Sequence, residues 1–232
     1  LNDQTKGGVV SSLLLPDLAL LDANLTLSLP PAVTAHTGID AMVHAIEAYT
    51  SRHRKNPVSD ALAQRALQLL HDNIRVAFHD GKNTGARSNM LLGACLAGMA
   101  FANAPVAAVH ALAYPLGGIF HLPHGLSNAL VLTEVLRFNR SAAQAQYAEL
   151  GRLLAGCAMP DDTACDFLID TLEALLVELK VDPRLSAYGI TEADLDRMAV
   201  DAMAQQRLLV NNPREVTLAD ARAIYAKRLH VA

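Results

Sequence analysis

The chain has 232 residues, of which 52% are hydrophobic and 18% charged, so it can bury a sizeable core and is not a disordered tail. Its 19 basic and 23 acidic side chains give a formal charge of −4. Because there is no basic stripe or polybasic segment, neither a nucleic acid nor a membrane surface is an expected partner.

The first 29 residues differ from the rest of the chain. Two short apolar runs, Val9-Val10 and Leu18–Leu21, are bounded by turn-forming residues. Such runs predict one or two short strands. We therefore expect a short extended segment before the main body of the protein.

After Pro30 the apolar residues recur at helical spacing almost to the end of the chain. Pro31 stands where a first-turn proline is favoured, and Thr217 is a candidate N-cap for the last helix. Residues 86–102 are apolar on all sides, which indicates a central, buried helix. The pattern predicts an all-α, multi-helical domain with helices at residues 31–49, 59–78, 86–102, 106–116, 126–138, 142–155, 163–179, 192–205 and 218–228.

Cysteine usage and hydropathy indicate the compartment. The three cysteines are an odd number without a repeating spacing, which argues against a disulfide framework and favours the reducing cytoplasm. No apolar run approaches the roughly 18 residues of a membrane-spanning helix. The sequence opens with Leu1 rather than Met, as expected of a piece of a longer chain.

The segment from Thr37 to Glu47 carries the first chemical signal. Asp40 and His44 are four residues apart on a predicted helix, so their side chains project from the same face. A carboxylate and an imidazole on an otherwise apolar helix are costly to bury unless each has a partner or a cation. A buried Asp–His hydrogen bond and a metal site both meet this requirement.

Two further histidines favour the metal site. His110 follows an apolar stretch, and His124 stands between Pro123 and Gly125, which can aim a loop side chain inward. One aspartate and three histidines form a suitable ligand set for Fe(II), Zn or Ni. Structural zinc sites normally use thiolates, and no cysteine lies near these positions. We therefore expect a catalytic metal with a coordination position left for water or substrate.

These motifs resemble the C-terminal half of the iron-containing (group III) alcohol dehydrogenases. The resemblance rests on Asp40–Tyr49 (DAMVHAIEAY), on His110 in VHALAYPLG and on LPHG at residues 122–125, and it extends from Pro16 to Glu215. The metal motif, the spacing of the last two histidines and the closing Asn-Pro-Arg segment all agree with that family.

The resemblance implies a fold and a ligand set. Residues 30–232 would form the helical, dehydroquinate synthase-like metal-binding catalytic domain, and residues 1–29 the end of a nucleotide-binding domain or a linker. The implied ion is Fe(II), and its four implied ligands are Asp40, His44, His110 and His124.

The resemblance also implies an activity. The enzyme would transfer a hydride between a primary alcohol or ω-hydroxy acid, or the corresponding aldehyde, and NAD or NADP. The cofactor would bind to an N-terminal domain that this chain lacks, so the isolated chain would be inactive and its own cofactor-binding residues stay unidentified. The family relationship further implies a homodimer.

One position near the expected site departs from the family. Many relatives have a histidine one helical turn after the third ligand, whereas this chain has Tyr114. Its hydroxyl can orient substrate or pass a proton, but the ordinary pKa of tyrosine, about 10, makes it a poor base at neutral pH.

Several rival functions stay open at this point. Asp40 disfavours the maleylacetate reductases, and the four-ligand set disfavours polyol dehydrogenases and dehydroquinate synthases. A helical module with a structural metal or an Asp–His network, and no catalysis of its own, is the alternative from another class.

Other polar and aromatic residues are weaker candidates. His36, one turn before Asp40, and His121 are candidates for contacting substrate. Glu47 can hydrogen-bond a ligand histidine, as metal sites often require, or form an ordinary ion pair on the helix surface. The candidate walls of a substrate pocket, with ordinary core packing as the alternative, are Phe101, Ile119 and Phe120.

Overall fold

The computed structural model describes residues 11–230, and every regular element in this part of the chain is a helix. The all-α prediction is therefore confirmed. The helices are α1 (Pro31–Tyr49), α2 (Pro57–His79), α3 (Thr84–Asn103), α4 (Ala108–Ile119), α5 (His124–Ala155), α6 (Asp161–Glu178), α7 (Leu195–Met203), α8 (Gln206–Leu209) and α9 (Leu218–Leu229).

Apart from shifts of a few residues at helix ends, the predicted helices differ from the observed ones in two places. The predicted helices 126–138 and 142–155 form one helix, α5, with a kink at Ala143, whose φ of −125° and ψ of 19° are not helical. The predicted helix 192–205 is broken into a short 3-10 turn at Glu192–Asp194 and α7, and α8 follows separately.

The strand expected at Leu18–Leu21 is wrong. These residues have no regular structure and lie between two 3-10 turns, Ser12–Leu14 and Ala23–Thr26. A strand needs a neighbour to pair its backbone groups, and residues 11–230 contain no other strand. Leu18 and Leu20 are 82% and 86% exposed, so their apolar pattern does not reflect burial within this chain. Val9-Val10 lies outside the described residues.

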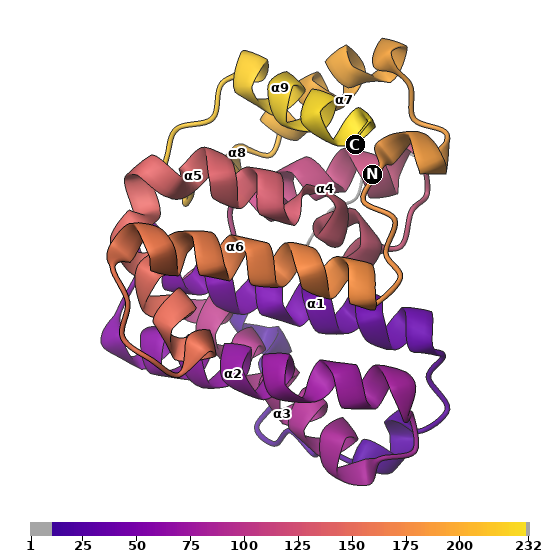
Figure 1. Cartoon of the computed structure of the whole chain (residues 1–232), viewed down its shortest axis with the longest axis vertical. Coiled ribbons are helices and arrows are strands. Elements are labelled where there is room, and N and C mark those ends of the chain that lie inside the picture. Colours follow the sequence, from indigo (N-terminus) through magenta and orange to yellow (C-terminus); the bar gives the residue numbers. More distant parts are fainter. Residues whose placement is uncertain (1–10, 231–232) are drawn as a thin grey trace.

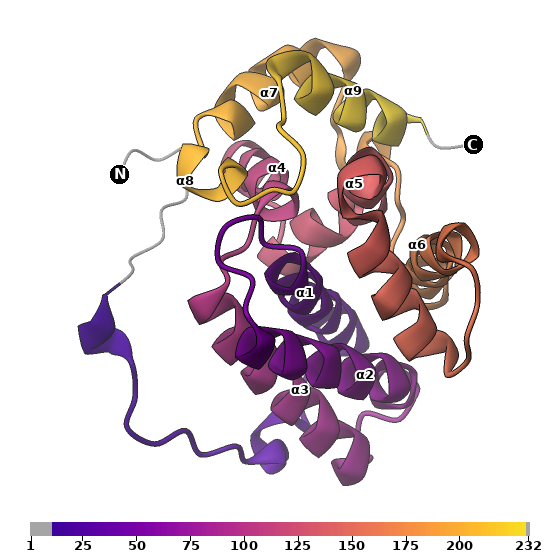
Figure 2. The same cartoon turned by 90° about the vertical axis from the view of Figure 1, so that its left-hand side faces the viewer.

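The helices are arranged in layers around α1. This helix packs against α2, α3 and α5, while α4 and α6 both lie against α5. Helices α7 and α9 contact each other and cover α4 and α5 on the side away from α2 and α3 (Figures 1 and 2). The segment before α1 runs outside this body until its second 3-10 turn meets α3 (Figure 2).

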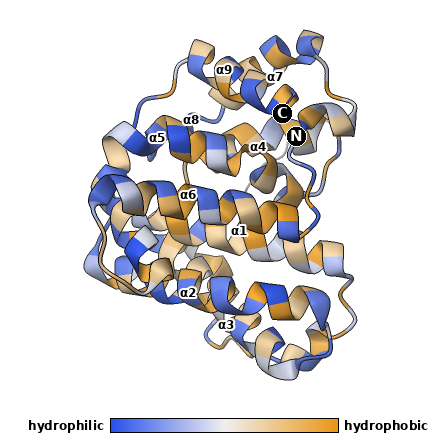
Figure 3. Ribbon diagram, in the orientation of Figure 1, coloured by the Kyte–Doolittle hydropathy of each residue, from blue (hydrophilic) through white to orange (hydrophobic). Residues whose placement is uncertain are grey.

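The core is continuous from α1 to α9. Figure 3 shows hydrophobic and hydrophilic residues interleaved along the helices, as expected of amphipathic helices whose apolar faces meet. Within the described chain no single helix is long and apolar enough to cross a membrane. Helices α3 and α4 meet that test only as a pair, and a bend of 108° separates them.

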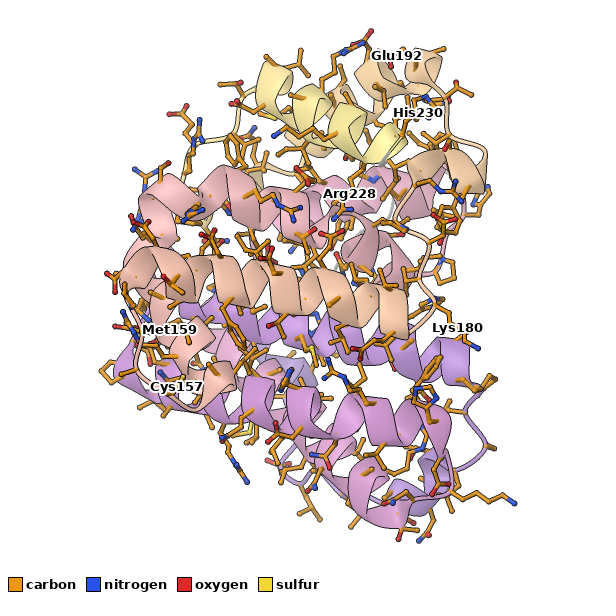
Figure 4. All side chains as sticks on the ribbon, viewed as in Figure 1. Cys157, Met159, Lys180, Glu192, Arg228 and His230 are labelled. Carbon is orange, nitrogen blue, oxygen red and sulfur yellow. The ribbon has the colours of Figure 1, made fainter. Side chains whose placement is uncertain are left out.

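A buried arginine joins three of these helices. Arg228 of α9 is fully buried where α9 faces α5 and α6 (Figure 4). Its guanidinium donates to both carboxylate oxygens of Glu173 on α6, at 2.9 and 3.0 Å, and to the hydroxyl of Thr133 on α5. This network attaches the C-terminal helix to the layer that carries part of the candidate site.

Candidate metal centre

The four predicted ligands converge where α1, α4 and α5 meet. Asp40 and His44 lie one turn apart on α1, His110 lies in the first turn of α4, and His124 is the first residue of α5. Their ligand atoms all lie within 4.8 Å of one another. Oδ1 of Asp40 is 3.6 Å from Nε2 of His44, 3.6 Å from that of His110 and 3.8 Å from that of His124. One atom from each side chain can therefore reach a common cation.

A glycine allows His124 to approach α1. Any Cβ added to Gly125 would overlap the backbone carbonyl of His36, so the beginning of α5 touches the backbone of α1. Pro123 precedes His124 with φ −53° and ψ 141°, an extended conformation from which α5 begins at once. The Pro-His-Gly sequence thus lets the start of α5 lie against α1, which brings Nε2 of His124 to 3.8 Å from Oδ1 of Asp40.

The imidazole rings pack against one another and against an aromatic wall. His44 stacks on His110 with ring centroids 4.8 Å apart, and its other neighbour, Phe101, is 4.6 Å away. The side chain of His110 is only 4% exposed, whereas that of His124 is 40% exposed. The cluster is therefore closed on the side of α4 and open beside His124.

Glu47 holds His110 from behind. Its side chain is buried, one carboxylate oxygen accepts from Nδ1 of His110 at 2.7 Å, and the other accepts from the backbone N–H of Val109 at 2.7 Å. The contact with Val109 satisfies a free N–H group in the first turn of α4. The contact with Nδ1 leaves Nε2 of His110 available as a ligand, which is the usual arrangement behind a metal-bound histidine. The ion-pair alternative on the helix surface is thus excluded for Glu47.

The charges of the cluster favour a cation at its centre. Burial alone would raise the pKa of Asp40, but His110 and the other two imidazoles lower it to about 2. Burial alone would lower the pKa of His110, but Asp40 and Glu47 raise it to about 9. Burial lowers the pKa of His44 to about 4, because the nearby carboxylates offset only part of the desolvation. Asp40 thus carries a negative charge beside all three imidazoles, and Glu47 adds a second negative charge behind His110. Both favour a positive charge in the cluster.

The donor set fits a divalent first-row metal. Three imidazoles and one carboxylate suit Fe(II), Zn or Ni, and Glu47 supplies the orienting partner that such sites use. Asn128, a fully buried neighbour of the cluster, places its amide nitrogen 2.6 Å from Oδ1 of Asp40, and its side-chain oxygen, at the other end of the amide, has no hydrogen-bond partner among the described residues. The residues present therefore fit the ion implied by the sequence.

Tyr114 lies at the open edge of the cluster. Its ring centroid is 6.3 Å from that of His124, and its hydroxyl accepts from the guanidinium of Arg207 on α8 at 3.4 Å. His36 is half-buried one turn before Asp40, and His121 is exposed in the loop before α5. Neither belongs to the group of converging ligand atoms.

Of the predicted pocket residues, Phe101 lies against the cluster. Phe101 packs on His44, whereas Ile119 and Phe120 are partly buried and pack against the hydrophobic core.

Sequence reasoning missed two polar neighbours. Asn128 follows His124 by one helical turn, the same signal that linked Asp40 and His44. Arg207 had no local signal, because α8 approaches α4 only in the folded chain.

Comparisons with known proteins agree with this geometry. Residues 34–229 match the model of the Fe-containing alcohol dehydrogenase family, C-terminal. The chain is 42% identical over 225 residues to long-chain-alcohol dehydrogenase 1 of Geobacillus thermodenitrificans, a match that covers 96% of this chain and 57% of that protein. It is 40% identical over 214 residues to sulfoacetaldehyde reductase of Bilophila wadsworthia, with 90% and 55% covered.

The fold is shared with solved structures as well. The crystal structure of a 1,3-propanediol oxidoreductase superposes with a TM-score of 0.86 at 35% identity, over 89% of this chain and 54% of that one. The chain thus spans about half the length of the relatives that it matches.

Proposed function

The chain belongs to the iron-containing alcohol dehydrogenase family, and from this premise we propose that it is the metal-binding part of an enzyme that transfers a hydride between a primary alcohol, or its aldehyde, and NAD or NADP. The observation that carries the proposal is the convergence of four ligand atoms within 4.8 Å, from three separate helices. In this proposal residues 30–232 are the helical catalytic domain. Residues 1–29 lead from a nucleotide-binding domain that holds the cofactor.

The proposed ligands are Asp40, His44, His110 and His124, with Fe(II) as the ion and Zn or Ni as alternatives. Such an ion supplies Lewis acidity toward an alcohol or carbonyl oxygen. The chain's own residues prepare the surroundings. Glu47 accepts from Nδ1 of His110 and so turns Nε2 toward the other ligands, Phe101 excludes water on the side of His44, and the exposed face of His124 leaves room for a substrate.

Tyr114 is the proposed orienting and proton-transfer group. Its oxygen accepts a hydrogen bond from Arg207, so its own O–H proton points to another acceptor. A substrate oxygen beside His124 can be that acceptor. A Tyr114→Phe enzyme is then expected to lose turnover by about tenfold or more while its metal content stays the same.

An acid-bearing alcohol is a second candidate substrate, favoured by Arg207. This guanidinium stands beside the Tyr114 hydroxyl and makes no ion pair with any of the described carboxylates. A carboxylate or sulfonate at the far end of an ω-hydroxy acid would pair with it. One relative is a sulfoacetaldehyde reductase, whose substrate carries such a group.

The metal site is tested first on this chain. Purified chain reconstituted with Fe(II) or Zn²⁺ is expected to retain one ion, and His110→Ala and His124→Ala to lose it. His121→Ala, which removes an exposed histidine three residues before His124, is the matched control and should retain the ion. In the full-length gene product the same two ligand variants should abolish alcohol oxidation. Retained metal and turnover in both variants would refute the proposal.

The substrate class is tested by Arg207→Leu in the full-length gene product. Loss of a charge-assisted hydrogen bond is worth about 1.5–3 kcal/mol, so KM for an ω-hydroxy acid should rise by about 10–100-fold. KM for a neutral alcohol of the same length and KM for NAD or NADP should not change. A rise in the cofactor KM instead would assign Arg207 to a cofactor phosphate and overturn the acid-bearing substrate.

The non-catalytic alternative makes a different prediction. A module with only a structural metal would bind the ion yet leave the full-length gene product without nicotinamide-dependent turnover.

We further propose a cytoplasmic homodimer. The unpaired state of Cys95, Cys157 and Cys165 favours a reducing compartment. The dimer is carried over from the family, and light scattering after gel filtration measures it.

A further inference from the structure

Asn128 contacts three of the four proposed ligands. It lies on α5 one turn after His124, and its side chain is fully buried. Its amide nitrogen donates to Oδ1 of Asp40 at 2.6 Å and lies 3.3 Å from Nε2 of both His110 and His124. The amide therefore covers the face of the ligand set that these three atoms form.

The orientation of this amide is unusual in its balance of donors and acceptors. The nitrogen has two hydrogens to donate, and three ligand atoms lie within 3.3 Å of it. The oxygen at the other end is buried and has no hydrogen-bond partner in the described part of the chain. A buried polar atom without a partner costs free energy, so such atoms are few in native proteins and each one calls for an explanation.

A divalent cation reverses which end of the amide suits the ligand set. The amide nitrogen carries partial positive charge and has no lone pair to offer, whereas the oxygen is a normal ligand for a hard cation. The two ends have nearly the same size, so a half-turn about the Cβ–Cγ bond needs no extra space. The same turn takes the oxygen out of the position in which it has no partner and places the amide nitrogen there.

We propose that Asn128 is a positioning residue with two orientations. Without a cation its nitrogen holds Asp40, His110 and His124 together in place of the ion. When a cation binds, the amide turns over and directs its oxygen toward the ion. This inference rests on the proposed metal site but goes beyond it, because it assigns a role to a residue outside the four ligands.

The orientation is measured directly by NMR on the full chain. In protein labelled with ¹⁵N at asparagine, the signal lost in Asn128→Leu identifies the side-chain amide. Without metal, its protons should show nuclear Overhauser contacts to the ring protons of His110 and His124. Saturation with Zn²⁺, which is diamagnetic, should abolish these contacts and shift both amide protons.

The possible results separate this inference from the metal site. Zn²⁺ uptake with loss of the ring contacts supports the two orientations. Uptake with unchanged ring contacts overturns the turning of Asn128 and leaves the metal site standing. A chain that takes up no Zn²⁺ overturns the metal site and this inference together.

A second measurement uses Zn²⁺ affinity, by competition with a chelator. Asn128→Leu should bind about 10–100-fold more weakly. Asn128→Asp keeps the shape and offers an oxygen from either end, so it should bind at least as tightly as the parent. The matched control is Asn89→Leu, which removes a 3.0 Å amide hydrogen bond to Asn73 away from the ligands and should leave the affinity unchanged. Weaker binding by a folded Asn128→Asp chain would show that a donated hydrogen is needed and would refute the proposal.

Discussion

Replacing Glu47 by glutamine tests how the metal centre is held from behind. The two oxygens of this buried carboxylate accept from Nδ1 of His110 and from the N–H of Val109, each at 2.7 Å. Glutamine keeps the shape but has one oxygen, which the Val109 N–H retains. The NH₂ end then faces Nδ1 of His110 and favours the tautomer that carries its proton on Nε2. That proton occupies the lone pair that a metal requires.

The expected loss follows from the role of such partners. An orienting group behind a ligand histidine is worth about 10–100-fold in metal affinity, or about 1.4–2.8 kcal/mol. Glu47→Gln keeps the contact with α4, so the fold should lose about 1–3 kcal/mol, the cost of one unsatisfied buried group. Glu47→Ala breaks both contacts and the buried pair with His110, which raises the expected loss of stability to about 3–5 kcal/mol.

Two measurements separate affinity from stability. Zn²⁺ affinity is determined by competition with a chelator, and the free energy of unfolding by urea titration of the metal-free chain. Glu178→Gln, which changes an exposed carboxylate of α6 paired with Arg75, is the control and should alter neither quantity. A Glu47→Gln chain that binds Zn²⁺ as tightly as the parent would refute the tautomer argument, whatever its stability.

Three further outcomes are expected. Gly125→Ala forces a Cβ into the carbonyl of His36, so stability should fall by about 1–3 kcal/mol and Zn²⁺ affinity with it, whereas Gly98→Ala, which meets open space, should weaken neither. Burial would raise the pKa of Glu173, but Arg228 and Thr133 lower it. Its contribution is therefore present above the unfolded pKa and lost as pH falls through the folded value, so urea titrations from about pH 6 to pH 3 should show a smaller loss of stability in Glu173→Gln than in the parent. Zn²⁺ should raise the melting temperature, and a chelator should reverse the rise. A melting temperature that changes with neither would contradict a site formed only in the folded chain.

The helices were predictable because their signals are local. Apolar spacing, Pro31 at the start of α1 and the Thr217 cap of α9 act within a few residues, and the structure confirms those helices. The expected strand at 18–21 failed for the opposite reason. An apolar run shows only that a segment avoids water, and a strand also needs a neighbour whose backbone can pair with it.

The candidate site likewise has one part that the local sequence predicts and one part that only the fold brings together. Asp40 and His44 share a helix face, so their proximity follows from a 3.6-residue repeat. His110 and His124 were added on ligand chemistry and family resemblance, and the fold brings their ligand atoms within 4.8 Å of the pair on α1. Glu47 was an open choice between two roles, which its 2.7 Å contact with His110 decides.

By itself, the order of amino acids determined the helical character of this protein and the identity of the side chains able to hold a cation, because both depend on neighbours within one or two turns. Only tertiary packing decided that α5 begins against the backbone of α1, that Asn128 faces three ligands with an unpartnered oxygen behind it, and that Arg207 meets Tyr114. These contacts join residues far apart in the chain, and their geometry is set by how whole helices fit together, which no local pattern specifies.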